Sequence, residues 1–259
     1  MRTILSLVLC GLMAVALHAA NLSPTACPAD QTAQSYETQF PSAGLACANG
    51  ILNFSNFNFQ VYQLSGAGPI LSASDVDLTP IGAPDQTGAT GFDVTGLNNS
   101  QISVEPGQDI TYVVDWFFVI DAGPIASGAS LGMDPPAGDI SITQYYCLDS
   151  NFQDGPIYNG SAPSCTTSIT GAPAAVQTLS VTTDIPDDLS DTVVFNPPAK
   201  DFGNVMTVIQ LTGGEGGAHL DTVNADAQIE IAPEPDTFLL AGGALLVFAL
   251  GRKFAGLRS

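Results

Sequence analysis

The chain has 259 residues and a formal net charge of −20 at pH 7, with 25 acidic residues against five lysines and arginines. This balance excludes nucleic acid as a partner, because binding to phosphates requires lysine and arginine to displace counterions, and it argues against docking on an anionic membrane. Hydrophobic residues make up 45% and charged residues 12% of the chain, which excludes intrinsic disorder and predicts a folded protein.

Residues 1–20 have the layout of a secretory signal peptide. A short positive segment, Met1-Arg2, precedes an apolar stretch at residues 4–17, and the small residues Ala19 and Ala20 follow it. The apolar stretch is too short to favour a stable spanning helix, although an uncleaved N-terminal anchor is the alternative. We therefore expect the chain to be exported and residues 1–20 to be removed.

Residues 21–232 are expected to form one exported domain, because no break in composition divides them and their length suits a substantial core. The interval from Asp30 to Asp236 contains all 25 acidic residues and a single basic residue, Lys200, giving a net charge of −24. Self-repulsion of this charge favours solubility, and the negative potential permits cation binding.

Four cysteines remain after the signal peptide: Cys27, Cys47, Cys147 and Cys165. An even number in an exported chain indicates two disulfides, for which three pairings are possible. Proximity in the sequence favours Cys27–Cys47 and Cys147–Cys165. Zinc is the alternative, but no pair has CxxC spacing and the mature chain has one histidine.

The body reads as a succession of short strands after one helix-tolerant segment. Residues 31–39 predict a short helix or an ordered arm, and residues 51–62 alternate as a strand does. Residues 109–121 form the densest apolar run and contain the single tryptophan, which predicts a central strand buried on both faces. Further strands are predicted at 76–78, 91–94, 101–104, 126–133, 139–148, 174–183, 191–196, 202–211 and 225–231.

These strands predict an all-β fold, an antiparallel two-sheet sandwich of jelly-roll or immunoglobulin-like topology. A signal helix at the N-terminus and a single transmembrane helix at the C-terminus complete the expected chain. The segment Gly213–Gly217 resembles a phosphate cradle only in its glycines, since it lacks the lysine of that motif and carries Glu215. We interpret it as a flexible hairpin loop.

No catalytic constellation stands out, and we expect no enzyme and no cofactor. His219 is the only histidine of the mature chain, and no GxSxG elbow accompanies it. Paired carboxylates could serve glycoside hydrolysis, but so many acidic residues make such pairs unavoidable by chance.

An acidic cluster around Pro186 is the candidate metal site. Calcium takes six to eight oxygen ligands, which carboxylates and loop carbonyls can supply. The alternative is a solvated acidic turn, because the spacing matches no known calcium loop. The candidate ligands are Asp184, Asp187, Asp188 and Asp191.

The last 27 residues consist of three parts that follow one another in a fixed order. Pro233-Glu234-Pro235 is followed by a predicted transmembrane segment at 237–251 and a basic end at 252–258. As a helix, its apolar residues Phe238–Gly251 span only about 21 Å against roughly 30 Å of hydrocarbon, which suits a transient membrane anchor. An ordinary C-terminal anchor and a buried helix are the alternatives. The membrane stop consists of Arg252, Lys253 and Arg258.

This tail resembles a PEP-CTERM sorting signal, with the sorting motif at Pro233, Glu234 and Pro235. It departs from the family pattern in Asp236 and in its thinned basic end. The resemblance implies an exosortase-type processing enzyme as partner, removal of the tail, and a membrane-anchored precursor that ends at the cell surface or outside the cell. It also implies association with an exopolysaccharide matrix or biofilm. The body is loosely similar to proteins of this kind with unknown activity.

The leading functional hypothesis is therefore a structural component of the cell surface or extracellular matrix. The runner-up is a calcium- or carbohydrate-binding module that uses loop carboxylates and aromatic residues such as Tyr145 and Tyr146. A hydrolase comes third.

Overall fold

The computed structural model describes residues 24–50, 52–82, 90–97, 101–120, 125–134, 136–155, 157–167, 174–184, 189–220 and 230–232. The predicted signal peptide and sorting tail lie outside these ranges. Within the described ranges, no helix is long and apolar enough to cross a membrane. The spanning helix predicted at 237–251 falls outside them and stays a prediction.

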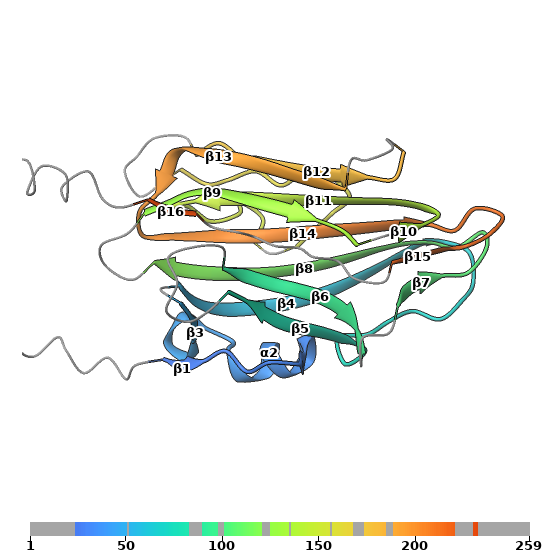
Figure 1. Cartoon of the computed structure of the whole chain (residues 1–259), viewed down its shortest axis with the longest axis horizontal. Helices are drawn as coiled ribbons and strands as arrows, with labels where there is room; N and C mark the ends of the chain where they lie inside the picture. Colours follow the sequence, from blue (N-terminus) through green and yellow to red (C-terminus); the bar gives the residue numbers. More distant parts are fainter. Residues whose placement is uncertain are drawn as a thin grey trace, which may run out of the picture.

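One large sheet forms the first layer of the fold, and Figure 1 shows its long strands side by side along the long axis of the molecule. Strands β1 and β3 pair in parallel, whereas the other neighbours pair antiparallel. The strand order is β1 (Thr25–Ala26), β3 (Cys47–Asn49), β4 (Leu52–Ser65), β8 (Asp109–Ile120), β14 (Phe202–Thr212), β11 (Asp139–Leu148) and β12 (Gln177–Thr182).

Three small antiparallel sheets cover one face of the large sheet. The first consists of β13 (Ser190–Ala199), β9 (Ile125–Gly132) and β16 (Glu230–Ala232). The second consists of β2 (Gln31–Thr32), β5 (Val76–Ile81) and β6 (Gly91–Gly96). The third consists of β10 (Pro136–Ala137), β15 (Ala218–Leu220) and β7 (Ile102–Val104). A helix, α2 (Ala33–Gln39), and a 3-10 turn, η1 (Ala43–Leu45), complete the described elements.

The main hydrophobic core lies between these two layers. It joins buried side chains of the large sheet with those of all three small sheets, among them Phe54, Trp116, Val205, Leu78, Phe92, Leu131 and Leu220. The all-β, mostly antiparallel and sandwich-like class is therefore confirmed. The second layer differs from the single sheet that was predicted, since its described strands form three separate sheets.

Strand β8 confirms the predicted central strand, because it lies between β4 and β14 and is buried on both faces. Successive side chains of a strand point to opposite faces. The main core therefore takes Ile110, Tyr112, Val114, Trp116 and Phe118. On the opposite face, Val113 joins a second, smaller cluster with Met206 and Phe152. Residues after β11 thus cover part of the outer face of the large sheet.

Other predicted elements agree with the structure to within a few residues. Residues 139–148 form β11 as predicted, and the helix predicted at 31–39 is α2. Thr32 caps this helix, since its Oγ1 accepts a hydrogen bond from the Ser35 N–H at 3.2 Å. Within the predicted strand 225–231, only residues 230 and 231 lie in the described part of the chain.

The prediction of a hairpin at Gly213–Gly217 is wrong. The segment connects β14 of the large sheet to β15 of a small sheet, so the two strands do not pair. The reason is its packing against the turn before β8. The Gly213 N–H donates to the Gln108 carbonyl at 2.8 Å, and a Cβ at Gly213 would lie 2.2 Å from the Glu105 carbonyl oxygen. This close backbone approach requires glycine and carries the chain from one layer to the other.

Candidate functional site

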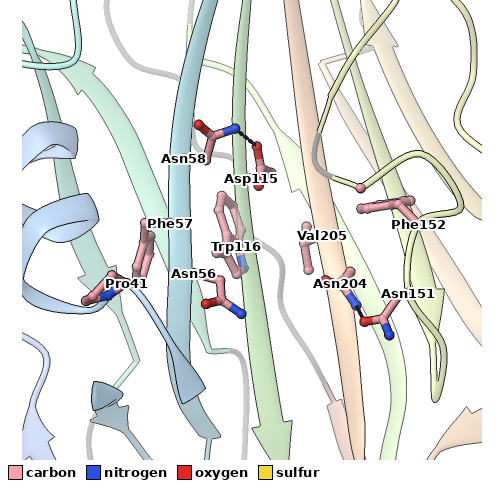
Figure 2. A pocket seen from close by; sticks show the side chains of 11 residues that line it. Pro41, Asn56, Phe57, Asn58, Asp115, Trp116, Asn151, Phe152, Asn204 and Val205 are labelled. Carbon is pink, nitrogen blue, oxygen red and sulfur yellow. Dashed lines mark hydrogen bonds between the residues drawn. The ribbon is translucent and has the colours of Figure 1, made fainter. Parts of the chain in front are cut away.

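A groove of about 470 Å³ crosses the outer face of the large sheet, opposite the main core. Figure 2 looks onto it, with Pro41 on one side and Phe152 on the other. Its floor comes from three adjacent strands, β4, β8 and β14, and its two walls come from loops.

A β-bulge in β4 shapes the floor. Ser55 pairs with Phe117 and Asn58 pairs with Asp115, so Asn56 and Phe57 together lie opposite Trp116. Asn56 has a φ of 55°, in the left-handed region that asparagine tolerates better than most residues. The extra residue leaves Phe57 in the main core and places Asn58 beside Asp115, while Asn56 is exposed in the groove.

The first wall is attached to this bulge. The Asn56 N–H donates to the Phe40 carbonyl at 2.8 Å, and the Phe59 N–H donates to Glu37 Oε1 at 2.5 Å. Both acceptors lie in or directly after α2. The bulge thus binds the helix end to β4 and places Pro41 at the rim of the groove.

The second wall is the segment that follows β11. Asn204 Nδ2 on β14 donates to the Ser150 carbonyl and to Asn151 Oδ1, both at 3.0 Å. Asp149, with a φ of 49°, accepts hydrogen bonds from three successive backbone N–H groups, of Lys200, Asp201 and Phe202, at 2.9 to 3.3 Å. These bonds fix the segment against the turn before β14, where Asn151 and Phe152 face the groove.

Each wall belongs to a loop that a disulfide closes. The structure contains Cys27–Cys47, with an S–S distance of 1.99 Å, and Cys147–Cys165, with 2.01 Å, which confirms the predicted cysteines and the favoured pairings. Pro41 lies inside the first loop, and the segment from Asn151 to Gly155 lies inside the second. Closing loops of this length restricts the unfolded chain and holds both walls in place.

The carboxyl group of Asp115 lies at the floor of the groove. Its side chain is 3% exposed, and its Oδ2 accepts a hydrogen bond from Asn58 Nδ2 at 2.8 Å. Burial raises the pKa of Asp115 well above its usual range, the Asn58 hydrogen bond opposes this shift, and the nearby charge of Glu37 adds to it.

The chemical character of the groove is polar and uncharged apart from this carboxyl. No lysine, arginine or histidine occurs among the described residues that line it. Pro41 and Phe152 provide apolar surface on the two walls. Primary amides both donate and accept hydrogen bonds, so the groove can bind a ligand rich in hydroxyl groups. The lining amides are those of Asn56, Asn58, Asn151 and Asn204.

The predicted calcium site is only partly described. Asp191 accepts hydrogen bonds from the backbone N–H groups of Ser180 at 2.9 Å and of Thr192 at 2.8 Å. Asp187 and Asp188 lie outside the described residues, so the calcium site stays a prediction. Over the described ranges, no three histidine, cysteine or acidic side chains form a group that could hold a metal ion.

The prediction that Tyr145 and Tyr146 both bind a ligand is wrong, because consecutive residues of β11 point to opposite faces of the sheet. Tyr146 is fully buried in the main core, and its hydroxyl donates to Gln144 Oε1 at 2.8 Å, so it cannot contact a ligand. Only its neighbour Tyr145 lies on the outer face, half-buried beside the second cluster. His219 is exposed on β15 and does not line the groove. The sorting motif and the membrane stop lie outside the described residues.

Sequence reasoning missed the groove residues because no motif joins Asn58, Asp115 and Asn204. One signal was present in the sequence. Asp115 interrupts the densest apolar run of the chain, and a carboxyl in a strand buried on both faces needs a reason to be there. The exposed residue of the bulge gave no comparable signal.

No protein-family model matches the chain, and no curated protein matches it. Among solved structures, the chain is similar to the carbohydrate-binding module TmCBM61 in complex with β-1,4-galactotriose. The TM-score is 0.28, and the sequence identity is 8% over 68% of this chain and 88% of that one. A similarity this low carries no argument about the fold or the ligand.

Proposed function

We propose that this protein is an exported component of the cell surface or extracellular matrix that binds carbohydrate in the groove on its outer face. The observation that carries the proposal is the lining of the groove, in which four asparagines and one buried carboxyl lie between two apolar walls. This combination suits a hydroxylated ligand with an apolar ring face.

Each part of the groove matches one property of a sugar. Asn56, which is exposed in the groove, offers an amide group to hydroxyls, which are donors and acceptors at once. Pro41, which is exposed on the first wall, presents apolar surface for the C–H face of a ring, and the largely buried Phe152 lines the opposite wall. The volume of about 470 Å³ lies within the usual range for small-molecule sites, about 300–1,000 Å³. Asp115 and the absence of a cation among the described lining residues disfavour anionic sugars.

The proposal is for binding without catalysis. A glycosidase of the usual kind needs two carboxyl groups, about 5–9.5 Å apart, on either side of the scissile bond. The described lining of the groove contributes one carboxyl, that of Asp115. The same chain displayed at a surface could hold matrix polysaccharide without altering it.

Asn58→Ala is expected to weaken carbohydrate binding by at least about tenfold. The change removes an amide from the groove floor and also the hydrogen bond that Asn58 Nδ2 donates to Asp115, and such bonds contribute about 0.5–3 kcal/mol each. The full-length chain is screened on a glycan array, and its strongest oligosaccharide is titrated by calorimetry. The control is Thr192→Ala, at an exposed position of β13 in the other layer, which should bind as the parent does.

A glycan array that is silent throughout contradicts the binding proposal and favours the purely structural role. Equal loss of binding in Asn58→Ala and Thr192→Ala would show that the ligand does not occupy the groove.

We further propose that the tail delivers this protein to the surface as a PEP-CTERM sorting signal. Support comes from the order of Pro233-Glu234-Pro235, the apolar segment and the basic end. The two disulfides suit an oxidising, extracellular compartment. The proposed partner is an exosortase-type enzyme that acts on a precursor transiently inserted in the membrane.

Mass spectrometry of the mature protein from its own host tests this route. We expect a product that lacks residues 1–20 and the apolar segment after the sorting motif, and that contains both disulfides. A mature chain that still carries Phe238 to Leu250 would contradict removal of the tail.

A further inference from the structure

Asp115 places its carboxyl group in the lining of the groove. Its side chain is almost fully buried, and the donor to its Oδ2 is the neutral amide of Asn58, at 2.8 Å. A buried carboxylate is costly unless it is paired, so a ligand that supplies a charged partner to the carboxylate gains affinity from it.

The surroundings of Asp115 specify the charge of that partner. On α2, Glu37 is close enough to raise the pKa of Asp115 through its negative charge. On β4 and β14, the facing residues are Asn58 and Met206, which carry no charge. Lys200 is the only basic residue between Asp30 and Asp236, and its exposed backbone lies at the turn bound by Asp149. The charge of Glu37, joined by that of Asp115 when Asp115 ionises, therefore gives the groove a negative potential that no described cation cancels.

We propose that the groove selects a carbohydrate bearing a protonated amine, such as a de-N-acetylated hexosamine unit, and that Asp115 pairs with the ammonium group. This inference rests on the proposed function, because it names the class of carbohydrate for the same groove. The amide of Asn56 binds hydroxyls, and the ammonium donates to the carboxylate of Asp115. Uronic acids and sulfated sugars are repelled by the same field.

Proton linkage gives this pairing a specific signature. Burial and Glu37 favour the protonated form of Asp115 in the empty groove. An ammonium group favours the carboxylate, so binding releases a proton from Asp115. Affinity should therefore rise with pH as Asp115 ionises, and then fall as the ligand amine, whose ordinary pKa is about 8, loses its charge.

The test titrates the full-length chain with three probes: glucosamine oligomers, N-acetylglucosamine oligomers and oligomers of a uronic acid. Calorimetry at pH 6 in two buffers of different ionisation enthalpy measures affinity and proton release together. We expect glucosamine oligomers to bind at least about tenfold more tightly than their N-acetylated counterparts, with net proton release and with affinity that falls as salt rises. Uronic acid oligomers should show no heat of binding.

Asp115→Asn keeps the shape of the side chain and removes its charge. In this variant the ratio of affinities for amine and acetamide should fall to about one, and proton release should disappear. The unliganded variant should melt at a higher temperature than the parent near pH 7, because the parent carries a buried carboxyl whose ionisation opposes folding. This second readout shows that the variant folds.

The following results would overturn the inference. Equal affinity of the parent for both hexosamine series, or tight binding of other neutral sugars alone, rejects amine selection and leaves carbohydrate binding in place. An amine preference that persists in Asp115→Asn rejects Asp115 as the partner. Absence of binding to every carbohydrate rejects this inference together with the proposed function.

Discussion

Phe92→Ala is expected to lower the free energy of unfolding by about 3–5 kcal/mol, the usual range for a buried phenylalanine. Phe92 is fully buried on β6, at the centre of an aromatic cluster that joins both layers of the fold. Its ring centroid lies 5.0 to 5.7 Å from the rings of Phe54, Phe57, Tyr36 and Trp116. The truncation would leave a cavity that these rings cannot close without moving.

The measurement is chemical denaturation of the full-length chain, and the matched control is Val194→Ala. Val194 is 80% exposed on β13, so its truncation should change stability by less than about 0.5 kcal/mol. A loss of less than about 1 kcal/mol in Phe92→Ala would contradict the packing of this core. The same cluster supports the groove from beneath, because Phe57 belongs to the bulge and Trp116 lies opposite it.

Removal of the Cys147–Cys165 disulfide is expected to weaken carbohydrate binding by more than about tenfold and to lower stability by about 3 kcal/mol on the chain-entropy model. The double variant Cys147→Ala, Cys165→Ala frees the segment that carries Asn151 and Phe152, one wall of the groove. Loss of that constraint increases the conformational entropy that binding must remove.

Denaturation and ligand titration of the same double variant separate the two effects. At a temperature where the variant is still folded by circular dichroism, affinity should already have fallen by more than about tenfold. The double variant Cys27→Ala, Cys47→Ala provides the comparison, since it releases the opposite wall at Pro41. Unchanged affinity in a folded chain without Cys147–Cys165 would show that this wall takes no part in binding.

The elements that depend on local pattern could be predicted from the sequence. The apolar run at 109–121 identified β8, and the period-two alternation at 139–148 identified β11. The short sequence separations of the cysteines, 20 and 18 residues, favoured the pairings that the structure has. These features are set by neighbouring residues, so a single sequence contains them.

The features that depend on contacts distant in sequence could not be predicted. The bulge at Asn56 is fixed by the register of β4 on β8 and by the carbonyl of Phe40. The glycine segment after β14 reads locally as a hairpin, but its packing against the turn before β8 sends the chain to another sheet. The groove also depends on contacts distant in sequence, because its floor and walls come from five separate stretches of chain.

Trp116 is the only tryptophan of the chain, and its buried ring packs in the main core directly beneath the floor of the groove, next to Asp115 in β8, so we expect its fluorescence to respond when a ligand occupies this site. The decisive measurement is a titration of the full-length chain with the oligosaccharide that binds most tightly on the array, followed by Trp116 emission. We predict a saturable change in emission, with a midpoint that matches calorimetry and that moves to at least about tenfold higher concentration in Asn58→Ala. Binding heat with no change in Trp116 emission, and with equal affinity in Asn58→Ala, would contradict a carbohydrate site in this groove.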